Sequence, residues 1–444
     1  MNMIYAGVKQ YDITPHRGVR LAGYPHFPRE NTGFHDSLYV TAIYISNGKD
    51  EFAFAALDIL FFSKKYAAEV RKRINSVCGI PEKNILICCS HTHSGPWAAG
   101  NPELEATTSG DGKDIDDDYL FVLLENITKA VVEAKKSSFE AEVGFGIGHI
   151  GAESGIGGNR RDKNGIVDDS LNILAVRNLQ GQLKGVIANY SLHPTFLHED
   201  SLLVSADYPA YLRYELSERF GGVAVGFAQG TSGDQSSRYF RRGQSFDEAE
   251  RVGRLMGKKA ADVIENMVFE KDFRMAHVWK ETEIRIRKYP PIEKLEEEVK
   301  ERTAYYEKLK KEGAAYLDVQ NANLRMLGAE DKLGYAICLR EGKRIDLYED
   351  ENPAEVSVFR MGDHVICGYP GEVFVNYGLV VKQKSKAAST FVFELADGCL
   401  PGYCITDDAY EEDGYEAGNC LLEPKFGDII SGIALDLIDE VMKN

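Results

Sequence analysis

The sequence has 444 residues, of which 44% are hydrophobic and 27% charged, as in an ordinary globular protein. Its formal net charge of −17 disfavours general attraction to nucleic acids and to anionic lipid surfaces, which leaves a small molecule as the favoured substrate. The eight cysteines are scattered without a CxxC pair, so we expect reduced thiols rather than a disulfide framework.

The amino terminus, MNMIYAGVKQ, lacks the basic end and the apolar stretch of a secretion signal. The most apolar window, 52–62, is too short to span a bilayer and contains Asp58. We therefore expect a cytoplasmic protein without stable membrane association.

Strand and helix patterns alternate along the first part of the chain. Residues 39–47 and 52–60 are expected to be strands, and 63–77 an amphipathic helix. The apolar run 84–90 predicts a buried strand, and apolar positions at helical spacing predict a helix over 117–136.

The later part of the chain continues this alternation. The expected elements are strands near 171–177 and 185–191, a helix near 208–219, a strand at 222–229, a charged helix at 291–313 and a hairpin at 355–369. The pattern predicts an α/β fold of layered mixed β-sheets flanked by helices. We expect one large catalytic domain over 1–444, with 289–350 as a helical insertion or appendage.

The motif HTHSGP directly follows the expected strand 84–90. Residues two apart on an extended segment point to the same side, so His91 and His93 can face one site. Neutral imidazole is a natural ligand of zinc, although the pair can also be incidental in a surface loop. The position after a buried strand favours a site, because α/β enzymes commonly place sites at the carboxyl ends of strands.

Two further polar segments also follow expected strands. His193, in NYSLHPT, is by itself more typical of a structural histidine, and nearby His198 is expected to be simply exposed. The segment GTSGDQSS at 230–237 is small, polar and glycine-rich. Its backbone N–H groups can bind an anion or oxyanion, and its serines are either nucleophiles or turn residues.

The last candidate residues lie in the carboxy-terminal quarter. Glu372 follows the Pro-Gly of YPGE, where a carboxylate is either a metal ligand or an acid in the first turn of a helix. Tyr403 lies in GYCIT, in a region dense in tyrosines that also fits plain packing. None of these segments establishes a function alone.

Taken together and in this order, the segments resemble the neutral, non-lysosomal ceramidase family, specifically its amino-terminal catalytic domain. The similarity begins near Asp12-Ile13-Thr14-Pro15 and runs through HTHSGP, its most specific match, LHPT, GTSGDQS, YPGE and GYCIT. By position, the resemblance implies a Zn²⁺ site with the ligands His91, His193, Glu372 and Tyr403. The spacing from Tyr403 to Tyr415 fits the family's Tyr…Tyr-Glu-Ala pattern without a gap.

The resemblance also implies the residues that act beside the metal. His93 and Arg160 are expected at the reacting centre, and Tyr403 is expected to donate toward the oxyanion as well as to bind the metal. Ser236 is the family's proposed nucleophile, although it can equally serve only to orient a water molecule.

The sequence departs from the family pattern in two places. Ser236 is followed by Ser237 and Arg238, where the family typically has Pro-Asn. Family ceramidases continue into an immunoglobulin-like domain, whereas this sequence ends at Asn444, so we expect a short member.

The expected function is that of a zinc-dependent hydrolase that cleaves the amide or ester bond of a small N-acyl or O-acyl substrate. True ceramidase activity on N-acylsphingosine is the alternative within this class. A zinc-dependent lyase or isomerase acting on a sugar derivative is an alternative of another class. A non-catalytic binding module is least expected, because all four implied ligands are present.

Overall fold

The structure is a computed structural model that describes residues 3–98, 116–343, 345 and 349–443. Its largest sheet has nine strands. Along the sheet these are β13 (Ala224–Gln229), β11 (Leu183–Tyr190), β10 (Ser170–Asn178), β8 (Phe139–His149), β1 (Tyr5–Asp12), β5 (Tyr39–Ser46), β6 (Glu51–Leu57) and β7 (Ile85–Cys89), with β15 (Phe269–Glu270) beside β8. A second sheet has the order β16 (Met275–Thr282), β17 (Ala354–Met361), β18 (His364–Gly368) and β20 (Ser389–Phe393).

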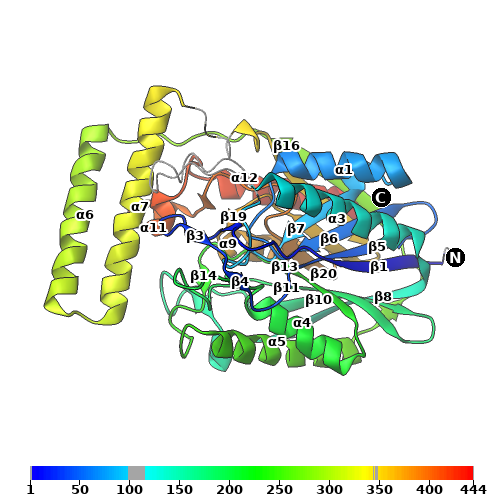
Figure 1. The fold of residues 1–444 in the computed structure, drawn as a ribbon. Coiled ribbons are helices and arrows are strands. Elements are labelled where there is room, and N and C mark those ends of the chain that lie inside the picture. The colour runs from blue at the N-terminus through cyan, green and yellow to red at the C-terminus, as the bar shows by residue number, and fades with distance from the viewer. Residues whose placement is uncertain (1–2, 99–115, 344, 346–348, 444) are drawn as a thin grey trace.

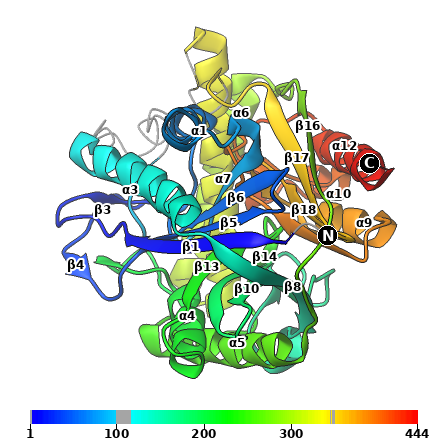
Figure 2. The ribbon, with the colours of Figure 1, turned by 90° about the vertical axis from the view of Figure 1, so that its right-hand side faces the viewer.

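The two sheets pack face to face and helices cover their outer faces. Phenylalanines of β6 meet Phe359 of β17 edge-on, with ring centroids 5.2 Å (Phe52) and 5.4 Å (Phe54) away. The helices α1 (Lys64–Cys78), α3 (Asp117–Lys136), α4 (Tyr208–Arg219) and α5 (Phe246–Asn266) pack on the large sheet. The helices α9 (Val375–Lys384) and α12 (Phe426–Lys443) pack on the small one (Figure 2). The expected α/β fold of mixed sheets flanked by helices is confirmed.

Parallel pairing within the sheet and the curl of the sheet together bring distant motifs close. β6 and β7 are parallel, so their carboxyl ends lie side by side, and the same holds for β11 and β13. The sheet also curls until β13 contacts β5, β6 and β7. Gly226 in β13 allows this approach, since a Cβ there would lie 2.9 Å from Cβ of Ala56 in β6. The loops after β7, β11 and β13 therefore face one another.

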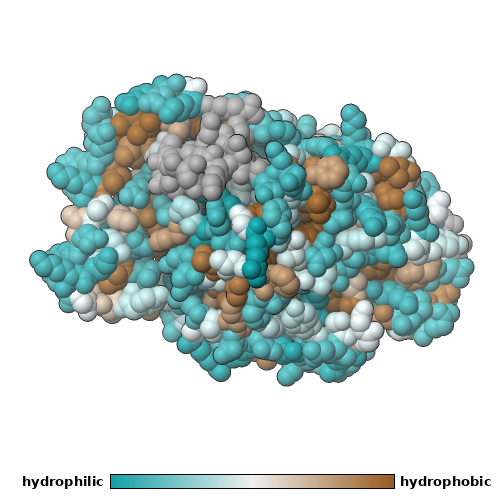
Figure 3. All heavy atoms as spheres, in the orientation of Figure 1, coloured by the Kyte–Doolittle hydropathy of each residue, from teal (hydrophilic) through white to brown (hydrophobic). Residues whose placement is uncertain are grey.

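The helices α6 (Ile292–Glu312) and α7 (Tyr316–Glu341) form an antiparallel hairpin at the side of the sheets (Figure 1). The hairpin lies within the expected appendage 289–350. In α6 only Ile292 and Leu295 are buried, which fits its highly charged sequence. Hydrophilic residues predominate on the face shown in Figure 3, and hydrophobic ones form small patches.

The hairpin is fixed to the body through α7 and the short helix α11 (Tyr415–Gly418). Lys332 of α7 donates to Glu298 of α6 and to Asp413 just before α11, with both N···O distances 2.8 Å. Gly418 lies so close to Gly328 of α7 that the two backbones touch. Glycine is required here because any larger side chain would separate the two helices.

All eight cysteines are free, as the sequence predicts. Among the residues that the structure describes, no helix combines the length and the apolarity that crossing a bilayer requires.

Substituting Gly418 with Ala is expected to destabilise the fold, because the new Cβ would lie 2.1 Å from the carbonyl oxygen of Gly328. Such overpacking costs about 1–3 kcal/mol of unfolding free energy. Gly432→Ala is the matched control: Gly432 is exposed on α12 with nothing within 4 Å of its Cβ position. The control should be neutral or slightly stabilising in the same denaturant titration. Equal stability of Gly418→Ala and wild type would contradict the close packing of α7 on α11.

Candidate active site

His91 is held in a backbone conformation that few non-glycine residues adopt. It follows β7 and Ser90 with a φ of 65°, in the left-handed region. Its N–H donates to Ile59 O (3.0 Å) and its ring Nδ1 lies 3.0 Å from Leu60 O, both in the segment after β6. Strain of this kind persists where the surroundings fix it, and here it aims the buried imidazole at the loops after β11 and β13.

His193 is fixed by the loop after β13. Its Nδ1 lies 2.9 Å from Ser232 O and 3.1 Å from Gln235 O, and its own N–H donates to Gln235 O (3.2 Å). Carbonyl oxygens only accept hydrogen bonds, so Nδ1 carries the hydrogen in both His91 and His193. In the neutral imidazoles, Nε2 of each ring is then left with a lone pair.

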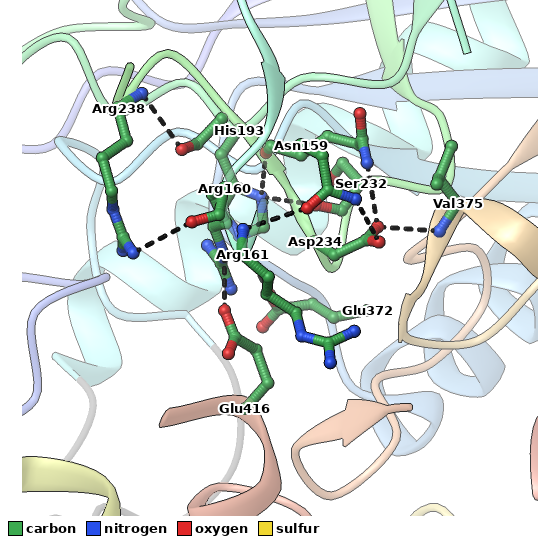
Figure 4. A network of polar contacts seen from close by, with 12 residues as sticks. Asn159, Arg160, Arg161, His193, Ser232, Asp234, Arg238, Glu372, Val375 and Glu416 are labelled. Carbon is green, nitrogen blue, oxygen red and sulfur yellow. Dashed lines mark hydrogen bonds and ion pairs between the residues drawn. The ribbon is translucent and has the colours of Figure 1, made fainter. Parts of the chain in front are cut away.

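Glu372 completes a triangle with these two nitrogens. Its Oε2 lies 3.2 Å from Nε2 of His91 and 3.1 Å from Nε2 of His193, and the two nitrogens are 3.2 Å apart. Glu372 is the first residue of β19 (Glu372–Val373), a short strand after β18, and does not begin a helix. Figure 4 shows its carboxylate below His193.

Three possible electron-pair donors converge in this triangle, an arrangement that suits a bound cation. A proton on one nitrogen would relieve only part of the repulsion, and burial lowers the pKa of His193 to about 4. Edges near 3.2 Å fit three ligands around one ion about 2.0–2.1 Å from each. The donor set of His91, His193 and Glu372 therefore fits a divalent metal.

His93 joins this cluster but differs from the other two histidines. Its Nε2 lies 3.4 Å from Nε2 of His91, and the three imidazoles form a group able to hold a metal ion. No hydrogen-bond partner of its buried Nδ1 is found in the described part of the chain. A metal-binding imidazole is normally oriented by such a partner, so His93 lacks the support that fixes the rings of His91 and His193.

Tyr403 lies next to Glu372, because β21 (Tyr403–Cys404) pairs with β19 in parallel and the two residues are in register. The Arg160 guanidinium carbon lies 5.2 Å from the centre of its ring. Burial raises the pKa of Tyr403 well above its usual range, so the phenol keeps its proton unless a cation replaces it. Its role as fourth ligand stays a prediction.

Arg160 is held by a carboxylate that the sequence did not single out for a role. Its Nε donates to Glu416 Oε1 (2.7 Å), and both side chains are buried (Figure 4). Its backbone N–H donates to Asp234 O (2.8 Å), which ties it to the loop after β13. Nη2 of Arg160 is buried and lacks a hydrogen-bond partner among the described residues.

Ser236 lies in β14 (Gln235–Ser236), which pairs with β9 (Gly158–Asn159) just before Arg160. Its Oγ accepts the N–H of Arg238 at 3.2 Å. In the described ranges no basic side chain hydrogen-bonds this Oγ, whereas an activated serine normally has an adjacent base. Its part in the reaction remains a prediction.

The loop after β13 is a buttress rather than an open set of donors. The N–H groups of Gly230, Gly233 and Gln235 donate to backbone carbonyls and are not free for an oxyanion. Ser232 donates to buried Glu394 (2.5 Å), whose other oxygen accepts the N–H of Val373 (2.8 Å). Glu394 thus joins the loop that orients His193 to the strand that carries Glu372. The sequence signal that could have revealed Glu394 was its position as a single carboxylate in the apolar stretch VFEL.

Two cavities share His93 and Tyr403 in their walls. The first, of about 120 Å³, adjoins His91 and Glu372. Its apolar wall consists of Leu60, Phe61, Trp97, Leu395 and Leu400. The second, of about 140 Å³, includes Ser236 and Arg160 and extends to α7. His198 lines it too and is only 23% exposed, with Nδ1 2.8 Å from Glu199 Oε2, so the expectation of a simply exposed side chain is wrong.

The protein-family model for the N-terminal part of the neutral/alkaline non-lysosomal ceramidases matches residues 5–247 of this chain. The chain belongs to this family. Neutral ceramidase from Pseudomonas aeruginosa has a similar structure, with 17% identity and a TM-score of 0.76 over 100% of this chain and 75% of that one. A second similar structure is a ceramidase complexed with C2, with 16% identity and a TM-score of 0.75 over 100% of this chain and 76% of that one.

Membership of the ceramidase family makes this protein an amide-bond hydrolase. The structural likeness, at such low identity, shows the fold. Neutral ceramidases are in general metal-dependent, which agrees with the donor set of this ceramidase-family member.

Purified protein is expected to contain about one divalent metal ion per chain. His91→Ala and His193→Ala should each lose most of it, and Glu372→Gln should weaken its binding because a neutral amide is a poorer ligand. His149→Ala, at an exposed histidine outside the cluster, is the control and should keep its metal. Elemental analysis that finds stoichiometric metal in both histidine variants would refute the assignment.

Proposed function

We propose that the protein is a zinc-dependent hydrolase of the amide bond of a small, water-soluble N-acyl compound. The observation that supports this most is the convergence of two Nε2 lone pairs and one carboxylate oxygen at the wall of a cavity. Imidazole and carboxylate ligands suit zinc, and an open coordination position is the mark of catalytic sites.

The residues of the chain divide the work around the scissile bond. Zinc, when bound, would polarise the amide carbonyl and make water more acidic. Arg160 offers its unpartnered Nη2 to negative charge that develops on the carbonyl oxygen, and the Tyr403 phenol can donate to the same oxygen. His93, with no partner on Nδ1, can pass a proton to the leaving amine.

The substrate proposal departs from the family name. The first cavity has a volume of about 120 Å³. An engineered cavity of roughly 150 Å³ in a protein core holds one benzene molecule, so the first cavity suits an acyl group of a few carbons. The second cavity carries arginine, serine and amide side chains on an otherwise apolar wall, which suits the amine side. An O-acyl substrate would be accommodated by the same geometry.

Ceramide is the second candidate. It is favoured by the family and by the names of the two similar structures. Membership of a hydrolase family disfavours the sugar lyase or isomerase that the sequence left open.

Ser236→Ala is expected to keep its metal and fold but to lose only part of its turnover, because no base activates the hydroxyl. Ser237→Ala, at the neighbouring buried serine, is the control and should be close to wild type. Single-turnover kinetics at equal metal content would measure both. Loss of nearly all turnover in Ser236→Ala alone would instead make the serine the nucleophile, and wild-type kinetics would remove it from both schemes.

A substrate panel tests the proposed class. Butyryl amides and esters of small amines and alcohols should be hydrolysed faster than their palmitoyl counterparts, since the acyl cavity is short. A fluorescent long-chain ceramide in detergent is the comparison, at matched zinc loading. Efficient ceramide turnover with none of the soluble compounds cleaved would show that the family name describes this member.

A further inference from the structure

The second cavity concentrates positive charge in a protein whose net charge is −17. Its walls include Arg160, Arg238 and Arg241, and among the described residues its one acidic wall residue is Glu199. That carboxylate is engaged by His198 at 2.8 Å. An excess of cations in one cavity of an acidic protein indicates a negatively charged occupant.

Arg238 and Arg241 have few partners of their own. Arg238 donates through Nη1 to Arg160 O (3.3 Å), and Arg241 hydrogen-bonds the Tyr316 phenol of α7. Neither forms an ion pair with a carboxylate in the part of the chain that the structure describes. Both are half-buried, and an arginine stays charged in such a setting.

Two arginines buried elsewhere in the fold, Arg213 and Arg360, have such partners. Arg213 pairs with buried Asp58, and Arg360 donates to the backbone carbonyls of Gly362, Val441 and Met442. Partly desolvated charge without a counter-charge is unfavourable, so the two cavity arginines have a cost that a bound anion would remove.

Arg160 adds a third guanidinium to this cavity. Its side chain is only 7% exposed and its Nη2 has no partner among the described residues, yet it lines the same cavity. Figure 4 shows Arg238 beside it.

We propose that the second cavity binds an anionic group, a carboxylate or a phosphate, on the amine side of the substrate. The inference rests on the proposed function, since it takes the scissile amide to lie where the cavities meet, at His93 and Tyr403. A short amine-side group then reaches Arg238 and Arg241. The α7 residues Gln320 and Asn323 line the same cavity and add neutral donors.

Matched substrates test the charge requirement. N-butyrylglycine carries a carboxylate and N-butyryl-phosphoethanolamine a phosphate, and N-butyrylglycinamide and N-butyrylethanolamine are their neutral counterparts. The anionic member of each pair should have a kcat/KM about tenfold to a hundredfold higher, the usual worth of hydrogen bonds to a charged group. The pair with the larger ratio identifies the anion.

Matched arginine variants locate the effect. Arg241→Gln should abolish most of the preference and Arg241→Lys should restore part of it. Arg242→Gln is the control. Arg242 is exposed and lines neither cavity, and its substitution removes the same charge. Equal losses in Arg241→Gln and Arg242→Gln would reduce the effect to net charge and overturn the proposal.

A binding measurement separates this inference from the proposed function. N-(butylsulfonyl)glycine and N-(butylsulfonyl)glycinamide mimic the amide pair but resist hydrolysis, so calorimetry on the zinc-loaded protein reports binding alone. Tighter binding of the anion, lost in Arg241→Gln, supports the anionic site even if no amide is cleaved. Equal affinities of the two compounds for the wild type would refute it, whatever the protein hydrolyses.

Discussion

The approach of His91, His193 and Glu372 to within 3.2 Å of one another is the constraint on which the site depends. Three electron-pair donors this close together are stabilised when a cation lies between them. The fold compels the approach, because each imidazole is fixed through Nδ1 to a backbone carbonyl and the carboxylate comes from a strand held by buried Glu394. The hydrogen bonds around the site thus hold the three donor side chains close together.

Chemistry and substrate selection are carried by different parts of the molecule. The metal-binding donors come from loops after β7 and β11 of the large sheet and from the short strand β19, whereas the wall of the positive cavity includes one face of α7. The two parts meet at α11, which contributes Glu416 to Arg160 and touches α7 through Gly418. A single short helix therefore couples the position of a reacting-centre arginine to the position of the hairpin.

The sequence predicted what local patterns determine. The bounds of α3 and α4 match the expected 117–136 and 208–219. Apolar spacing marks the buried face of α3, whereas the start of α4 is marked by the Asp207 cap and by Pro209 in its first turn. The pairing of Arg160 with Glu416 was not predictable, since 256 residues separate them and no periodicity links them. Strand β8 was missed because its glycines weaken the strand pattern. Helix α5 was also missed, although its start had a sequence signal: Ser245 caps the helix by accepting the N–H of Glu248.

The contact of Gly328 with Gly418 also bears on how this family member can acquire new substrates. Because α7 is fixed to the body from Gly328 onward, through Lys332, Tyr335 and the contact with Gly418, the earlier cavity residues Gln320 and Asn323 can vary while the metal-binding loops stay as they are. Mutations at these two positions would alter selectivity without the stability losses that changes at the reacting centre bring. The hairpin is thus a natural target for directed evolution that leaves the metal-binding residues unchanged.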